Sequence, residues 1–178
     1  MNLYFRFLVF GSLLVLGSMT SLRVNAETSR IEFQAGPSYM DNHGANAAFV
    51  DLTLEERPIG DSAWRWSPDF LAGWIDGRDV PRHRDDRYTT RDDIGLVAAG
   101  VRLRYGVPGT WLRHLFFSFQ PVLHTGRTQA LSSGYAFAST LGWQGRRISV
   151  QVRHISNGSL HAPNRGETMV LLGLGFDP

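Results

Sequence analysis

The chain has 178 residues, no cysteine, and 18 Lys and Arg residues against 16 Asp and Glu, every basic one being an arginine. The absence of cysteine excludes disulfides and thiolate metal sites. Arg6 and Arg23 lie in the first 26 residues, which hold no acidic residue. Setting these two aside leaves 16 basic and 16 acidic side chains, so the charge gives no support for nucleic-acid binding.

The first 26 residues have the pattern of an export signal. Arg6 supplies a positive start, residues 7–19 form an apolar run, and residues 24–26 end in the small-residue pattern of a cleavage site. The apolar run is short for a membrane-spanning helix, which needs about 20 residues, and no other run approaches that length. We therefore predict a signal peptide over residues 1–26 and a single domain over residues 27–178.

Eight segments of the remaining chain alternate between apolar and polar residues, as strands with two different faces do. They cover residues 30–37, 47–55, 63–75, 93–105, 115–123, 134–143, 146–156 and 168–176. Between residues 93 and 105, for example, Val97 and Val101 share one face, and Gly100 and Arg102 share the other. No segment indicates a helix convincingly, so the sequence predicts an all-β fold.

The apolar face can turn inward, as in a soluble barrel or sandwich, or outward to lipid, as in a transmembrane barrel. Several segments approach the roughly 9–11 residues that a bilayer-crossing strand needs. Aromatic residues such as Trp64, Tyr105 and Trp143 lie near segment ends, as in interfacial girdles, and Phe176 ends the last segment. These features favour an eight-stranded antiparallel transmembrane β-barrel of the bacterial outer membrane.

Arginines on the polar face would then occupy a narrow interior, where an unpaired charge is costly. We expect Arg102, Arg104 and Arg153 to pair with acidic residues on that face, namely Glu32, Asp51 or Asp69. The sequence therefore predicts a filled barrel with no wide channel.

The connections between segments differ in length and set the orientation. With both termini in the periplasm, residues 38–46, 76–92, 124–133 and 157–167 form the outside connections, and residues 56–62, 106–114 and 144–145 the inside ones. The outside set is longer, as in bacterial barrels. Residues 76–93 hold five arginines and six aspartates, which indicates a self-neutralising solvated loop or, alternatively, a surface whose arginines bind phosphates.

His154 and Ser156 lie two residues apart at the outer end of the segment 146–156, and so project from the same face as Val150 and Val152. A lone His-x-Ser is most simply a polar rim of a structural barrel. Here, however, a potential base and a potential nucleophile lie on an apolar face. This arrangement favours an activated serine whose substrate is apolar and lies at the depth of the outer leaflet.

The string His154-x-Ser156-Asn157, followed by Pro163-Asn164-x-Gly166 and a terminal strand, resembles the lipid A 3-O-deacylase (PagL) family. The resemblance implies an eight-stranded outer-membrane barrel with a Ser-His-acid site on its lipid-facing surface. Such a site hydrolyses the 3-O-linked acyl chain of lipid A in lipopolysaccharide and releases a 3-hydroxy fatty acid. It implies no cofactor, and no metal site is expected.

The same resemblance assigns roles to individual residues. Ser156 would be the nucleophile, His154 the general base and Glu167 the acid that orients the imidazole. Asn157 would support the site, and Asn164 would help to stabilise the oxyanion together with a backbone N–H near residues 158–159. A regular strand from residue 167 would turn Glu167 inward and Thr168 outward, so the acid role requires a bulge or a late strand start.

Two other functions remain open at this point. Outer-membrane phospholipase A shares a His-x-Ser-Asn-Gly element but has an asparagine as third member, depends on calcium and forms a twelve-stranded barrel, for which this chain is too short. A non-enzymatic barrel acting in adhesion or envelope integrity is the alternative from another class. The sequence also leaves open whether the protein forms a homodimer.

Overall fold

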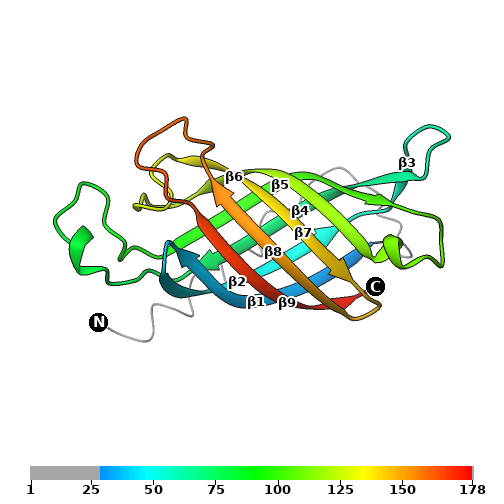
Figure 1. The fold of residues 1–178 in the computed structure, drawn as a ribbon, viewed down its shortest axis with the longest axis horizontal. Helices are drawn as coiled ribbons and strands as arrows, with labels where there is room; N and C mark the ends of the chain where they lie inside the picture. Colours follow the sequence, from blue (N-terminus) through cyan, green and yellow to red (C-terminus); the bar gives the residue numbers. More distant parts are fainter. Residues whose placement is uncertain (1–28, 178) are drawn as a thin grey trace, which may run out of the picture.

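The computed structural model describes residues 29–177, and within them the chain forms a closed antiparallel β-barrel of eight long strands (Figure 1). These are β1 (Arg30–Met40), β2 (His43–Thr53), β4 (Trp64–Ile75), β5 (Ile94–Tyr105), β6 (Leu115–His124), β7 (Tyr135–Gln144), β8 (Ile148–Ser156) and β9 (Glu167–Phe176). Each long strand pairs with its neighbours along the chain, and β9 pairs with β1 to close the barrel. The predicted eight-stranded all-β barrel is confirmed.

Smaller elements occupy the connections. A two-residue strand, β3 (Arg57–Pro58), pairs with the start of β4, and two 3₁₀ turns, η4 (Pro81–His83) and η5 (Trp111–His114), lie between longer strands. No helix within residues 29–177 is long and apolar enough to cross a membrane. The predicted signal peptide, residues 1–26, lies outside the described residues.

The alternation of the sequence becomes two surfaces of the barrel wall. On β8, Val150 and Val152 are 44% and 48% exposed, whereas Gln151 and Arg153 between and after them are each 1% exposed. The apolar side chains therefore form the outside and the polar side chains fill the inside, as the transmembrane interpretation predicts. An eight-stranded barrel is just wide enough for its own side chains, so the interior is packed.

The interior contains a charged network centred on Arg102. Its guanidinium bonds to Asp51 and Asp69 at 2.9 and 3.2 Å and lies over the ring of Phe116 at 4.2 Å. Arg153 extends the network, because one of its nitrogens lies 3.7 Å from a carboxylate oxygen of Asp51. The predicted pairing of these two arginines is confirmed.

The predicted partner of Arg104 was wrong. Its guanidinium pairs with Glu56 at 3.0 Å, a residue in the connection that follows β2, and not with Glu32, Asp51 or Asp69. Arg104 lies near the end of β5, so its long side chain reaches the mouth of the barrel, where Glu56 enters from the connection. The local alternation gives no information about that connection.

The two ends of the barrel differ in their connections. At one end, here called the long-loop end, the connections are residues 76–93, 125–134 and 157–166, seen on the left of Figure 1. The opposite end, the short-loop end, carries residues 54–63, 106–114 and 145–147. The long loops pack on one another: Gln129 N–H donates to the Thr89 carbonyl, and Gly166 N–H donates to the Ala130 carbonyl, both at 3.1 Å.

The predicted connection at residues 38–46 is wrong, because β1 and β2 continue as far as Met40 and His43. Only two residues turn the chain, and Asp41 has φ +53°. The sequence around the turn is polar and lacks clear alternation. Ser38 nevertheless belongs to the strand, since its side chain is buried and its hydroxyl bonds to a residue of β9.

Candidate active site

His154 and Ser156 lie next to each other on the outward face of β8, at the long-loop end. His154 is opposite Ser139 of β7 and Thr168 of β9, and Ser156 is opposite Phe137 of β7. The imidazole is exposed and Ser156 is half-buried. The structure therefore brings the predicted base and nucleophile to one face, on the apolar outer surface.

The imidazole has a neighbour on each of two sides, one in β9 and one in the loop just before it. Its Nδ1 lies 2.9 Å from the Thr168 hydroxyl. On the other edge, a Cβ added at Gly166 would lie 2.7 Å from Cε1 and 3.2 Å from Nε2 of His154, so only a glycine allows the chain to pass this closely. Gly166 also has φ +70°, a conformation that glycine adopts without strain. Within residues 29–177 no hydrogen bond joins the Ser156 hydroxyl to the imidazole, and such bonds are often long in unliganded catalytic sites.

The two asparagines of the motif hold the turn after Ser156. Asn157 is fully buried; its backbone N–H donates to Asn164 Oδ1 at 3.0 Å, and its Nδ2 donates to the His161 carbonyl at 2.8 Å. With its oxygen engaged, the half-buried Asn164 is left with its amide N–H groups as donors. Gly158 and Ser159 have φ +67° and +62°, so the chain turns sharply just beyond Ser156. Asn157 and Asn164 therefore tie the two sides of this turn together, and the Asn164 amide can still donate a hydrogen bond.

The structure does not bring Glu167 to the imidazole. Its carboxylate is inside the barrel, 5% exposed, and accepts hydrogen bonds from Arg78 at 2.8 and 2.9 Å and from the Ser38 hydroxyl at 2.6 Å. The reason is strand geometry: β9 is regular from its first residue, and Glu167 is opposite the inward-facing Ile155. The bulge that the acid role requires is absent from this part of β9.

Sequence reasoning gave Thr168 an outward position but no role. The signal that identifies it is the alternation itself, since Thr168 has the parity of Val170 and is opposite His154. Gly166 was part of the motif, but its contact with the imidazole depends on how the loop 157–166 returns to β9.

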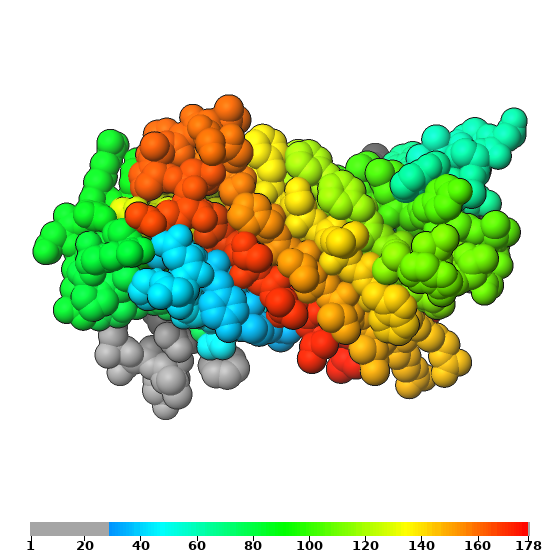
Figure 2. Space-filling model, viewed as in Figure 1, coloured from blue at the N-terminus to red at the C-terminus, as the bar shows by residue number. Residues whose placement is uncertain are grey.

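An aromatic surface adjoins Ser156. Phe137, opposite Ser156, stacks on Phe119 of β6 with ring centroids 5.8 Å apart and meets Tyr135 edge-on at 6.3 Å. Figure 2 shows β7 and β8 on the viewed face of the barrel, with the loop 157–166 in orange above them. An apolar chain lying along the barrel wall would reach Ser156 over this surface.

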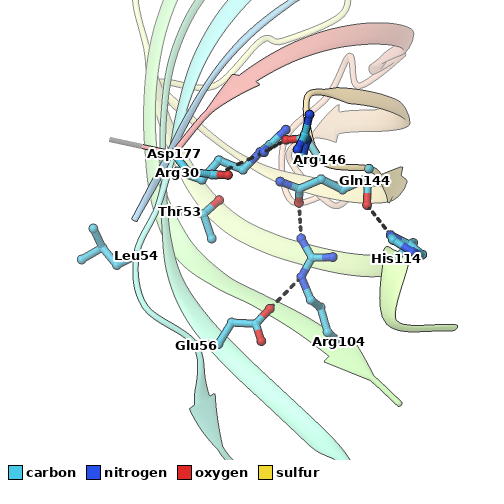
Figure 3. A pocket seen from close by; sticks show the side chains of 10 residues that line it. Arg30, Thr53, Leu54, Glu56, Arg104, His114, Gln144, Arg146 and Asp177 are labelled. Atoms are coloured by element: carbon cyan, nitrogen blue, oxygen red, sulfur yellow. Dashed lines mark hydrogen bonds and ion pairs between the residues drawn. The ribbon is translucent and has the colours of Figure 1, made fainter. Parts of the chain in front are cut away.

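A cavity lies at the other end of the barrel. It has a volume of about 390 Å³, and its charged lining comprises Arg30, Arg104, Arg146, Glu56 and Asp177. Figure 3 shows these side chains bonded largely to one another at the short-loop mouth. The lining of this cavity includes neither His154 nor Ser156, which lie on the outer wall of the barrel at the long-loop end.

The arginines of the charged loop at residues 76–93 are mostly paired with carboxylates, some inside the loop and others outside it. Hydrogen bonds from Arg84 and Arg91 lower the pKa of Asp79 to about 2, and Arg82 pairs with Asp41 at 2.8 Å. This favours the solvated-loop interpretation over a phosphate-binding surface.

Comparisons with known proteins identify a similar family and a similar fold. A protein-family model described as lipid A 3-O-deacylase (PagL) matches residues 113–177, a range that includes all five predicted site residues. Among solved structures, the chain is similar to "Crystal structure of the outer membrane enzyme PagL", with a TM-score of 0.55 and 15% identity over 84% of this chain and 99% of that chain. No curated protein sequence matches the chain. The resemblance predicted from the His-x-Ser motif is confirmed, and the structural likeness confirms the outer-membrane barrel fold.

Proposed function

We propose that the protein is an outer-membrane esterase that hydrolyses the 3-O-linked acyl chain of lipid A. The observation that carries this proposal is the match of residues 113–177 to the lipid A deacylase family, combined with a His-x-Ser pair on the outward apolar wall. A lipid substrate is anchored in the leaflet and diffuses laterally, so a nucleophile on the outer wall meets the ester at its own depth.

The chemistry that these residues support is acyl transfer to serine. Ser156 Oγ attacks the ester carbonyl while His154 Nε2 takes the hydroxyl proton. The C–O bond to the sugar breaks, and the imidazolium returns the proton to the departing sugar hydroxyl. Water then attacks the acyl-serine with His154 as base, the bond between the acyl carbon and Ser156 Oγ breaks, and the imidazolium returns the proton to Oγ as the 3-hydroxy fatty acid leaves.

The orientation of the barrel follows from the substrate. Lipopolysaccharide occupies the outer leaflet, so the long-loop end, where Ser156 lies, is assigned to the cell exterior. The longer loops of bacterial barrels also lie outside. Export by a cleaved signal over residues 1–26 is part of the same proposal.

The test is a mass spectrum of lipid A from cells expressing the full chain and from the same cells without it. We expect the loss of one 3-hydroxyacyl group only when the chain is present. Analysis of phospholipids from the same cells, with and without calcium, tests the alternative function. Release of phospholipid acyl chains while lipid A stays intact would indicate a phospholipase. Unchanged lipids of both classes, with the barrel folded in the outer membrane, would favour a structural or adhesion role.

Asn164→Ala tests the oxyanion assignment. Removal of one such donor is expected to lower kcat by about 100-fold, because the donor acts on charge that develops in the transition state. Kinetics with purified lipid A in detergent measure this. The control is Asn46→Ala, which removes an exposed asparagine hydrogen-bonded to Asp76, outside the candidate site. Equal activity of both variants would contradict the role of Asn164.

A further inference from the structure

We propose that Thr168, and not an acidic residue, positions the imidazole of His154 for catalysis; this inference rests on the proposed function. The Thr168 hydroxyl lies 2.9 Å from His154 Nδ1, and the two residues are directly opposite each other in the β8–β9 ladder. Thr168 shares the outward face of the barrel with His154. Val170 and Leu172, which follow Thr168 at steps of two residues along β9, lie on the same face. Thr168 occupies the place at which a Ser-His-acid site has its carboxylate.

Glu167 is committed to the opposite side of the wall. Its carboxylate neutralises the buried guanidinium of Arg78, 8% exposed, and also accepts from Ser38. Moving it outward would leave Arg78 unpaired inside the barrel, which is strongly unfavourable. It would also require a bulge at the start of β9, and β9 instead pairs regularly with β8 from Glu167 onward.

A threonine can perform part of the work of a carboxylate. Its hydroxyl oxygen accepts a hydrogen bond from Nδ1–H, which leaves the Nε2 lone pair free to take the Ser156 proton. The same hydroxyl can also donate to an unprotonated Nδ1. It therefore fixes the orientation of the ring but does not by itself select one tautomer. It carries no charge and therefore gives the imidazolium less stabilisation than a carboxylate would.

The location explains why a neutral partner suits this site. Thr168 is exposed on the outer wall, next to the apolar side chains of β8 and β9. An ionised carboxylate on the lipid-facing surface of a barrel is unfavourable, by an amount that depends on its depth. A hydroxyl that bonds to the imidazole avoids this cost, and Gly166 restrains the ring from its other edge.

The test compares Thr168→Val, Thr168→Ser and Glu167→Gln in the full barrel purified in detergent. Deacylation of lipid A gives kcat and KM, and labelling by a fluorophosphonate reports the reactivity of Ser156 directly. Thr168→Val is expected to lower kcat and the labelling rate by about tenfold or more with KM nearly unchanged, the size expected for one lost hydrogen bond. Thr168→Ser is expected to restore most of both rates. Glu167→Gln is expected to keep kcat and to lower the thermal stability of the barrel.

A gain-of-function variant keeps the test independent of damage to the fold. Thr168→Glu supplies a carboxylate at the imidazole and is expected to raise kcat several-fold, which no purely structural role of Thr168 predicts. Normal kcat in Thr168→Val together with loss of kcat in folded Glu167→Gln would overturn the inference while the deacylase function stands. Wild-type protein that neither deacylates lipid A nor labels at Ser156 would overturn both.

Discussion

Replacement of Ser156 by alanine is expected to abolish deacylation, with kcat reduced by about 10⁴-fold or more, the loss typical when a serine nucleophile is removed. The Ser156 hydroxyl is the only side-chain group in the proposed mechanism that bonds to the acyl carbon, and without it the acyl-enzyme cannot form on this residue. Ser156 is half-buried on the outer surface and fills no part of the barrel interior. The variant should therefore fold like the wild type, as judged by heat-modifiable migration in gels.

The matched control for this prediction is Ser139→Ala. Ser139 is also a serine beside His154, directly opposite it on β7, and has the same half-buried exposure. Its loss should change kcat by less than about threefold, the range of ordinary surface substitutions. Kinetics on purified lipid A separate the two. If Ser139→Ala were inactive and Ser156→Ala active, the nucleophile would be Ser139, and the role of the His-x-Ser motif would have to be abandoned.

The alternation of the sequence predicted the fold well because in a small barrel each side chain faces either the lumen or the outside. Val150, Gln151 and Val152 show this directly, since their exposures follow their order in the chain. The tip of the first hairpin was not predicted, because the contacts that extend its strands are distant in the sequence. Ser38 pairs with Met169 of β9, and its hydroxyl bonds to Glu167, 129 residues away; no local pattern contains these contacts.

The site was predictable to the extent that it is local. His154 and Ser156 are two residues apart on one strand, so alternation alone puts them on one face. The proposed partner of the imidazole comes from another strand, β9. For that position the family resemblance indicated Glu167, whereas the strand parity turned Thr168 outward. The structure follows the parity, with Thr168 outward and Glu167 inward, because the buried Arg78 requires a carboxylate inside the barrel.

Replacement of Arg102 by methionine is the substitution expected to destabilise the barrel most. Arg102 is 1% exposed and bonds to Asp51 and Asp69, which are equally buried. Without the guanidinium, two carboxylates face each other in the interior, and removal of one partner from such a buried network costs about 3–5 kcal/mol. Methionine keeps much of the side chain's length and its contact with the Phe116 ring, so the loss is mainly electrostatic. Equilibrium unfolding in urea, followed by tryptophan fluorescence of the detergent-solubilised barrel, measures the free energy of unfolding.

A comparison with Arg82→Met tests whether burial of the ion pair causes the loss of stability in Arg102→Met. The ion pair between Arg82 and Asp41 is 2.8 Å long, as short as the pair between Arg102 and Asp51, but the Arg82 side chain is 54% exposed. An exposed pair of this kind contributes about 0–1 kcal/mol, so Arg82→Met should unfold almost like the wild type. Adding Asp51→Asn and Asp69→Asn to Arg102→Met should recover part of the lost stability, because the uncompensated charges are then removed. If Arg102→Met and Arg82→Met cost the same, the buried network contributes no more than a surface pair, and the barrel must owe its stability to the wall's hydrogen bonds and its apolar outer face.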